Sequence, residues 1–372
     1  MSATNGSTSR RGLVVCVLAV AFALSAVFAS SAGAMAPVKE RYLALGDSLA
    51  FGYSQQLFNE NEKTGENPAA FEHGYANYYM NKLKWKANGI QLVNNGCPGE
   101  TSGGLIGTGP LGIGLAKGGA EPEAECEYHN VSGLPLHHEY GAGKSQLENA
   151  LETIAVAAGE GKPVTRLSLN IGANDQLHAV KKCEEEAKPT AEAAYIKAFT
   201  ETLEKGGTPA EADAAGKAAA AAAGKAFVEN CLKEKAKALF EHIAHNIGAT
   251  LFALRKGAEF GGVNYTGKII LQGGYDPFGN VFGKGELLPN STALVSILNG
   301  IEEKEVAPPF GACFANPFPR FNPLNKAEPL RLQTLTNMAN FTEFEGKKNG
   351  PDIHPTVTGY KVLGNLMAVA CP

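Results

Sequence analysis

Short apolar runs alternate with amphipathic stretches along most of the chain, and this alternation predicts strands separated by helices. Four runs have the pattern of buried strands, namely Arg41–Leu45, Ile90–Val93, Val164–Asn170 and Lys268–Leu271. Helical patterns lie at about 76–86, 145–158, 226–247, 330–341 and 356–370. Strands that are joined through helices of this length need crossover connections, so the pattern predicts a parallel sheet with helices on both faces.

Two segments depart from this alternation. Residues 102–143 are rich in glycine and contain three prolines, which predicts a long irregular excursion. Residues 184–230 are dominated by Ala, Glu and Lys, so we expect them to be helical but to pack weakly, as a hairpin on the surface. No repeat or linker divides the chain, and we therefore predict a single α/β domain over residues 35–372 with two insertions.

The first 34 residues have the organisation of an export signal. Arg10 and Arg11 precede an apolar run over 13–29, and small residues follow at 32–34. The run is shorter than the roughly 20 residues that span a bilayer, so a membrane anchor is the weaker alternative. General secretion is favoured, with a twin-arginine route left open. We expect a secreted protein, extracellular or in the cell envelope, with no stable membrane insertion after signal removal.

The charge balance argues against a nucleic-acid partner. The chain has 33 basic and 37 acidic residues and a net charge of −4, so no global excess of basic residues neutralises phosphates. Removal of residues 1–34 takes away two arginines and no acid, which leaves the mature chain mildly acidic. With 44 glycines in 372 residues, long loops are expected.

Six of the seven cysteines lie beyond the signal, which predicts three disulfides in an exported protein. Six cysteines allow 15 pairings. We favour the pairs that close the shortest loops: Cys97–Cys126, Cys183–Cys231 and Cys313–Cys371. A zinc site is the alternative, but no CxxC pair is present, and we expect His242 and His245 to lie on a solvated helix face.

Three candidate functional residues follow the ends of predicted strands. Ser48 stands in Gly-Asp-Ser-Leu after the first strand, Gly99 in a glycine turn after the second, and Asn174 in Gly-Ala-Asn-Asp after the third. In a parallel sheet these ends meet at one crevice. A serine hydroxyl there can act as a nucleophile, while a glycine N–H and an asparagine amide can stabilise an oxyanion. Each fragment alone is also an ordinary turn or cap sequence.

A histidine stands immediately before the last predicted helix, in Asp352-Ile353-His354-Pro355. Histidine is the general base that suits acyl transfer near neutral pH, and a neighbouring acid can hold its tautomer. His354 and Asp352 are therefore the candidate base and its orienting acid.

Together, the four fragments resemble the SGNH hydrolase superfamily, the GDSL lipases and esterases. The resemblance implies a flavodoxin-like three-layer α/β/α sandwich around a five-stranded parallel sheet. It also implies Ser48 as nucleophile and first oxyanion donor, Gly99 and Asn174 as further donors, and His354 as base. The usual family ending is Asp-x-x-His, whereas here Pro351 stands three residues before the histidine. Asp352 or a backbone carbonyl therefore orients His354. The export signal and six cysteines resemble secreted three-disulfide members, which supports the sequential pairing.

The resemblance implies a monomeric ester hydrolase that acts through an acyl-enzyme and needs no metal or organic cofactor. Lipid esters, short-chain esters, phospholipids and acetylated sugars are possible substrates, and a sugar O-acetylesterase or a non-catalytic exported binding protein is the alternative. Six phenylalanines either line an acyl pocket or belong to the core: Phe278, Phe282, Phe310, Phe314, Phe318 and Phe321. Our hypothesis for the Ala-rich insertion is a lid or wall beside the crevice.

Overall fold

The computed structural model describes residues 36–64, 68–107, 144–283, 285–288, 290–323 and 331–372. Val38–Pro372 forms one compact unit. The predicted signal peptide at 1–34 and residues 108–143 of the predicted Gly-rich insertion lie outside the described residues.

A single five-stranded parallel sheet forms the centre of the compact unit. Its strands lie in the order β2-β1-β3-β4-β5 and every neighbouring pair is parallel. Their bounds are Glu40–Gly46 for β1, Ile90–Asn94 for β2, Val164–Asn170 for β3, Lys268–Gln272 for β4 and Ala312–Ala315 for β5. This is the flavodoxin-like order, in which the chain reverses direction across the sheet between β1 and β3. The predicted fold class is confirmed, and all four predicted strands form.

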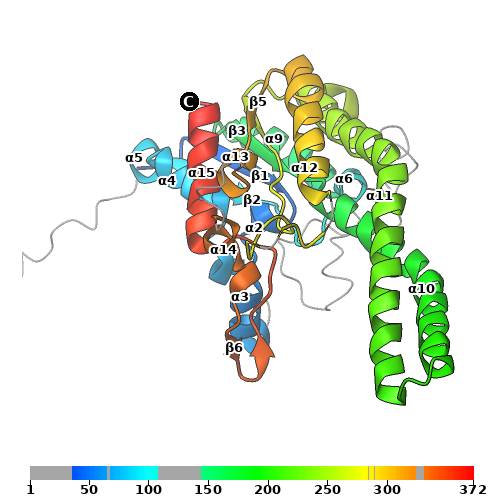
Figure 1. The fold of residues 1–372 in the computed structure, drawn as a ribbon. Helices are drawn as coiled ribbons and strands as arrows, with labels where there is room; N and C mark the ends of the chain where they lie inside the picture. The colour runs from blue at the N-terminus through cyan, green and yellow to red at the C-terminus, as the bar shows by residue number, and fades with distance from the viewer. Residues whose placement is uncertain (1–35, 65–67, 108–143, 284, 289, 324–330) are drawn as a thin grey trace, which may run out of the picture. The chain divides into compact units, whose positions relative to one another are not determined.

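Helices cover both faces of the sheet, which gives three layers (Figure 1). Successive strand residues point to opposite faces, so Leu43 and Leu45 of β1 pack in one buried cluster and Tyr42 and Ala44 in the other. The first cluster is completed by α9 (Gln146–Gly159), α11 (Pro209–Arg255) and α12 (Ser291–Ile301), and the second by α4 (Tyr75–Lys82) and α15 (Val357–Ala370).

The remaining α-helices and β-strands of the described residues are short apart from α10. They are α2 (Ser48–Phe51), α3 (Gln55–Asn61), α5 (Trp85–Asn88), α6 (Ser102–Ile106), α10 (Ala173–Glu204), α13 (Phe318–Phe321), α14 (Arg331–Leu335), β6 (Glu343–Phe344) and β7 (Lys347–Lys348). No helix in the part of the chain that the structure describes combines the length and the apolar character needed to cross a membrane.

Two predicted helices form nearly as expected, and two are interrupted. α9 begins after Ser145, whose hydroxyl and Glu148 make a capping box, and α15 begins after the capping Thr356. The helix predicted over 76–86 divides into α4 and α5, because Lys84 has a φ of 53° in the left-handed region. The helix predicted over 330–341 ends at Leu335, and an extended residue follows.

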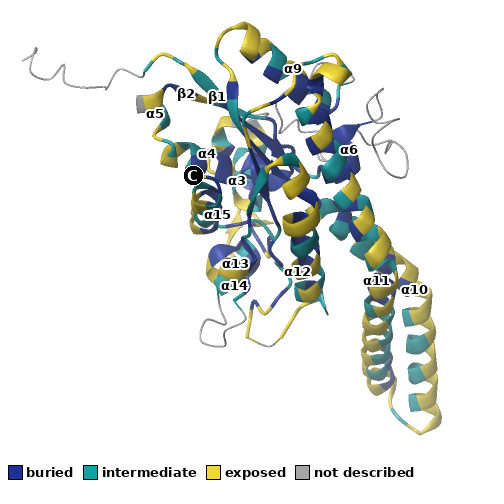
Figure 2. Cartoon of the chain, turned by 90° about the horizontal axis from the view of Figure 1, so that it is seen from above, coloured by how far each residue is buried: buried dark blue, intermediate teal, exposed yellow. Residues whose placement is uncertain are grey.

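The Ala-rich insertion is helical, as predicted, and forms the outer part of a long antiparallel hairpin of α10 and α11. Both views show these helices running side by side away from the sheet, and the colouring of Figure 2 shows mostly exposed residues toward the tip (Figures 1 and 2). The predicted helix at 226–247 is an inner part of α11, which continues over 47 residues. Close to the tip, a Cβ on Gly216 would lie 2.6 Å from the ring of Tyr195, so glycine allows this close packing.

Two of the three predicted disulfides are present. Cys183–Cys231 joins α10 to α11 with a Cα–Cα distance of 5.9 Å, and Cys313–Cys371 joins β5 to the end of α15 at 5.6 Å. The third predicted pair, Cys97–Cys126, includes a residue outside the described part of the chain and stays a prediction.

Candidate active site

Ser48 lies at the carboxyl end of β1, where the chain turns sharply into α2. Gly46 has a φ of 131°, and a Cβ there would lie 1.9 Å from the carbonyl oxygen of Asn170 at the end of β3. Only glycine therefore allows the two strand ends to approach this closely. Asp47 then caps α2 by accepting a 2.9 Å hydrogen bond from the N–H of Leu49. Ser48 becomes the first residue of α2, at the crevice beside the reversal in strand order.

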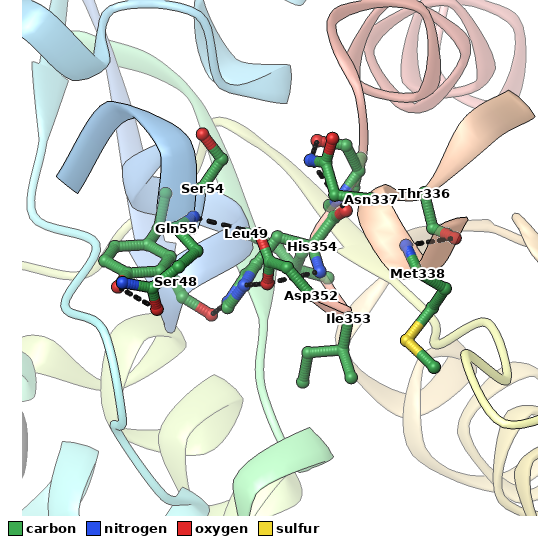
Figure 3. Close-up of polar contacts among 12 residues, drawn as sticks. Ser48, Leu49, Ser54, Gln55, Thr336, Asn337, Met338, Asp352, Ile353 and His354 are labelled. Atoms are coloured by element: carbon green, nitrogen blue, oxygen red, sulfur yellow. Dashed lines mark hydrogen bonds and ion pairs between the residues drawn. The ribbon is translucent and has the colours of Figure 1, made fainter. Parts of the chain in front are cut away.

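The structure brings Ser48, His354 and Asp352 together in one hydrogen-bonded chain (Figure 3). His354 Nε2 lies 2.8 Å from Ser48 Oγ, and His354 Nδ1 lies 2.5 Å from Asp352 Oδ1. Their side chains are almost buried, with 14% of His354 and 7% of Asp352 exposed. In this geometry an imidazole that holds its proton on Nδ1 can accept the serine proton at Nε2.

Asp352 is held in its ionised form. Burial acts to raise the pKa of Asp352, but the His354 imidazole and the hydrogen bonds that the carboxylate accepts hold that pKa below its ordinary value. The donors include the backbone N–H of Gln55, at 2.9 Å from Oδ2, and that of His354, at 3.1 Å from Oδ1. A permanent carboxylate at this place stabilises an imidazolium that forms during proton transfer.

Asp47 behaves differently from Asp352 although both carboxyls are buried. Burial raises the pKa of Asp47 to about 7, and the hydrogen bond from Leu49 and the nearby His354 only partly offset this rise. Asp47 therefore carries a full charge only above neutral pH. Its role in the Gly-Asp-Ser-Leu segment is to cap α2.

Three further contacts position the histidine. The backbone N–H of Asn337 donates to the carbonyl of His354 at 2.9 Å, and the hydroxyl of Tyr275 donates to the carbonyl of Ile353 at 2.6 Å. The ring of Tyr53 meets the imidazole edge-on, with centroids 4.7 Å apart. Sequence reasoning missed these residues, because each contact joins segments far apart in the chain and no local motif marks it.

Of the predicted oxyanion donors, Ser48 and Asn174 line the same cavity. Ser48 is the first residue of α2, so its N–H belongs to a turn whose N–H groups have no partner within the helix. Asn174 Nδ2 donates to the carbonyl of Glu100 at 2.8 Å, which fixes the amide and leaves its second hydrogen for another acceptor. Gly99 lies one residue before Glu100 with a φ of 86°. The described residues that line the cavity do not include Gly99.

The cavity beside Ser48 and His354 and the solvent space at its mouth together span about 1130 Å³, and the wall is largely apolar. The inner ends of α10 and α11 and one side of α12 supply most of this wall, including Leu177, Val180, Leu232, Leu239, Leu294 and Leu298. No residue of the outer hairpin, between 186 and 228, is among the described lining residues. The base of the hairpin is therefore a wall of the cavity.

Of the six phenylalanines, Phe278 alone is among the described lining residues. Phe318 and Phe321 are buried, Phe310 and Phe314 pack against the core, and Phe282 is 38% exposed. Most of the group therefore belongs to the core or the surface, and leucines are the commonest apolar residues among the described lining of the cavity.

A buried polar cluster lies under the loop that follows β2. Asp175 accepts hydrogen bonds from the N–H and the hydroxyl of Ser102, at 2.9 and 2.6 Å. Asn246 Nδ2 lies 3.1 Å from Ser102 Oγ and 3.2 Å from His242 Nε2. The expectation of a solvated face was wrong for His242, which is half-buried in this cluster, whereas His245 is exposed. Within the described ranges, no group of three or more His, Cys, Asp or Glu side chains is placed to hold a metal ion.

No protein-family model and no curated protein matches the chain. Among solved structures, it is similar to a gut microbial diltiazem-metabolizing enzyme, with 13% identity over 91% of this chain, 49% of that chain's length and a TM-score of 0.38. It is also similar to a candidate GDSL-like lipase from Parabacteroides merdae, at 15% identity, 90% and 96% coverage and a TM-score of 0.35. A third similar structure is a carbohydrate acetylesterase family member from Sinorhizobium meliloti. It has 10% sequence identity over 89% of this chain and 96% of that chain, with a TM-score of 0.37. All three TM-scores are below 0.5.

Proposed function

We propose that the chain is an exported serine hydrolase that cleaves carboxylic esters through an acyl-enzyme on Ser48. The observation that carries this proposal is the continuous hydrogen-bonded chain Ser48–His354–Asp352, which opens onto an apolar cavity. A serine beside a base that is itself oriented by a buried acid is the arrangement that activates a hydroxyl for nucleophilic attack.

In the first step, His354 Nε2 takes the proton of Ser48 Oγ as this oxygen attacks the ester carbonyl. The carbonyl oxygen becomes an oxyanion, for which the Ser48 N–H and the Asn174 amide are the donors, with Gly99 as the third donor that the sequence motif implies. His354 then returns the proton to the leaving alcohol. Water, activated by the same nitrogen, releases the acid and restores Ser48. The reaction uses only these side chains and water.

The apolar wall favours an ester with a hydrocarbon chain over the acetyl group of a polysaccharide, because leucine side chains gain free energy by excluding water from such a chain. Disulfides persist in oxidising compartments, and the pairs Cys183–Cys231 and Cys313–Cys371 therefore support export.

The test compares wild type with Ser48→Ala on p-nitrophenyl esters from acetyl to palmitoyl and on acetylated xylan. We expect wild-type turnover that is greatest on acyl chains longer than acetyl, and none above background in the variant. Labelling by a fluorophosphonate probe should likewise require Ser48. Retained hydrolysis in Ser48→Ala would disprove the nucleophile, and wild type that neither hydrolyses esters nor reacts with the probe would indicate a binding protein.

A further inference from the structure

A buried glutamate that takes no part in the proposed catalytic hydrogen bonds lies in the wall of the apolar cavity. Glu302 begins a π-helical turn, Glu302–Val306, at the end of α12, and only 2% of it is exposed. It lines the same cavity as Ser48 and His354. π-Helical turns are rare and occur often at functional sites.

The carboxyl of Glu302 is incompletely satisfied. Its Oε2 is buried and has no hydrogen-bond partner among the described residues. Asn299, one turn earlier on α12, bonds through both its Oδ1 and its Nδ2 to Gly274, at 2.8 Å each, and is thereby occupied. A buried polar atom without a partner costs free energy, and Oε2 is closed to solvent, so a ligand in the cavity can supply the partner once the carboxyl turns toward it.

The chemistry of the ligand follows from the charge state of this acid. Burial raises the pKa of Glu302 well above its ordinary value, which favours the neutral carboxylic acid, and in that form the group has one O–H donor and a carbonyl acceptor. An ammonium ligand would have to form a buried ion pair and meet the cost of dehydrating both charges. A hydroxyl group both accepts and donates a hydrogen bond and therefore complements the neutral acid without that cost.

We propose that Glu302 binds a hydroxyl group on the hydrocarbon chain of the substrate, so that the preferred esters are hydroxy-substituted aliphatic esters. This inference rests on the proposed esterase function and adds the class of chain that the cavity selects. The apolar wall accommodates the methylene groups, and the Glu302 carboxyl rewards a hydroxyl at one position along the chain. A site built to bond a hydroxyl discriminates against the analogue that lacks it.

The experiment compares p-nitrophenyl esters of ω-hydroxy acids with the unsubstituted esters of equal length, over acyl chains of about four to twelve carbons. Acetate monoesters of the corresponding diols and simple alcohols probe the alcohol side of the ester. At one or two lengths, we expect kcat/KM for the hydroxy ester to exceed that of the plain ester about tenfold. Glu302→Leu should abolish this ratio or invert it, whereas Glu302→Gln should keep part of it, because its amide also donates and accepts.

Glu303→Gln is the matched control, since Glu303 is the next residue along the same turn and is exposed. This variant should keep the wild-type ratio. A ratio near one at every length, or a ratio that Glu302→Leu leaves intact, overturns the inference and leaves an ordered water as the partner of the acid.

The two proposals fail in distinguishable ways. Hydrolysis of plain esters that depends on Ser48, without any hydroxyl preference, overturns only the role of Glu302. If wild type hydrolyses no ester, calorimetry of the same proteins with ω-hydroxy and plain fatty acids decides the matter. Tighter binding of the hydroxy acid that Glu302→Leu removes supports the binding role without catalysis, and equal binding of both acids overturns it.

Discussion

The hydrogen bond between Asp352 and His354 fixes which imidazole nitrogen carries the proton. Asp352 Oδ1, 2.5 Å from Nδ1, requires a proton on that nitrogen, and this leaves Nε2 as an acceptor facing Ser48 at 2.8 Å. The spacing of the acid, two residues before the histidine instead of three, therefore still allows the contact. A backbone carbonyl is not needed to explain the orientation of the ring.

The substitution Asp352→Asn tests this directly. An asparagine amide that donates to Nδ1 favours the other tautomer, with the proton on Nε2, where the imidazole cannot accept the proton of Ser48. We expect kcat for a p-nitrophenyl ester to fall by roughly 10³- to 10⁴-fold, as occurs when the acid of a serine triad is replaced in this way.

Asp213→Asn, in the outer hairpin, serves as control and should keep wild-type kcat, because Asp213 contacts Tyr195 and Lys217 far along the chain from the site. A loss of less than tenfold in Asp352→Asn would instead show that a backbone group orients the imidazole.

At the scale of single residues, the sequence predicted Ser48, His354 and Asp352 because each lies within a short motif next to a strand end or helix start. Glu302 and Tyr275 were not predicted from the sequence. Glu302 becomes a cavity residue, and Tyr275 donates a hydrogen bond to the loop that carries His354, only when the chain folds. Burial and contacts across the sheet, which no local pattern encodes, distinguish them from ordinary surface residues.

At the scale of elements, each of the four predicted strands contains a run of apolar residues that is long enough to be recognised as a buried strand from the sequence. β5 has four residues, of which only Ala315 is fully buried, so neither its length nor its pattern separates it from the surrounding Gly- and Pro-rich loop. Its pairing with β4 and its disulfide to Cys371 hold it in the sheet, and both are tertiary constraints. The hairpin was predicted as helical from its alanines, but its length and direction come from packing.

The described residues that line the cavity include none from the outer hairpin, and its removal tests the lid hypothesis. Deleting residues 188–226 and joining the ends through a short Gly-rich turn retains the Cys183–Cys231 disulfide and the contact of Glu186 with Lys235. Because the described lining residues lie outside the deleted segment, we expect KM and the acyl-chain preference to stay within about twofold of wild type.

Circular dichroism and thermal unfolding of the deletion variant establish that it folds. A shift in chain-length preference in a folded variant would restore the lid hypothesis. Unchanged kinetics would leave the outer hairpin with a role separate from ester hydrolysis.

At the scale of the whole molecule, buried carboxyls around the carboxyl edge of the sheet make stability depend on pH. The pKa of Asp47, Asp276 and Glu302 is raised by burial, whereas that of Asp352 is lowered by its partners in spite of burial. An acid with a raised pKa stabilises the fold fully below its unfolded pKa, and this contribution is lost as the pH rises through the folded pKa. Asp352 acts in the opposite direction, and its contribution is lost as the pH falls below about 4.

Asp47 faces both His354 and Asp175, and its pKa is raised from 3.8 to about 7. As the pH rises across this range, the free energy of unfolding falls by about 4 kcal/mol. Burial of Glu302 adds a loss of stability in the same direction, which begins as the pH rises above its ordinary pKa of 4.5. We therefore expect the midpoint of thermal unfolding, measured by calorimetry, to be higher at pH 5 than at pH 8.

Glu302→Gln should reduce this difference between the midpoints at pH 5 and pH 8, because an amide has no proton to lose, while Glu303→Gln should follow wild type. Parallel curves for wild type and Glu302→Gln would show that Glu302 is ionised at pH 8 in the folded protein, and the neutral acid needed for hydroxyl binding would then be absent.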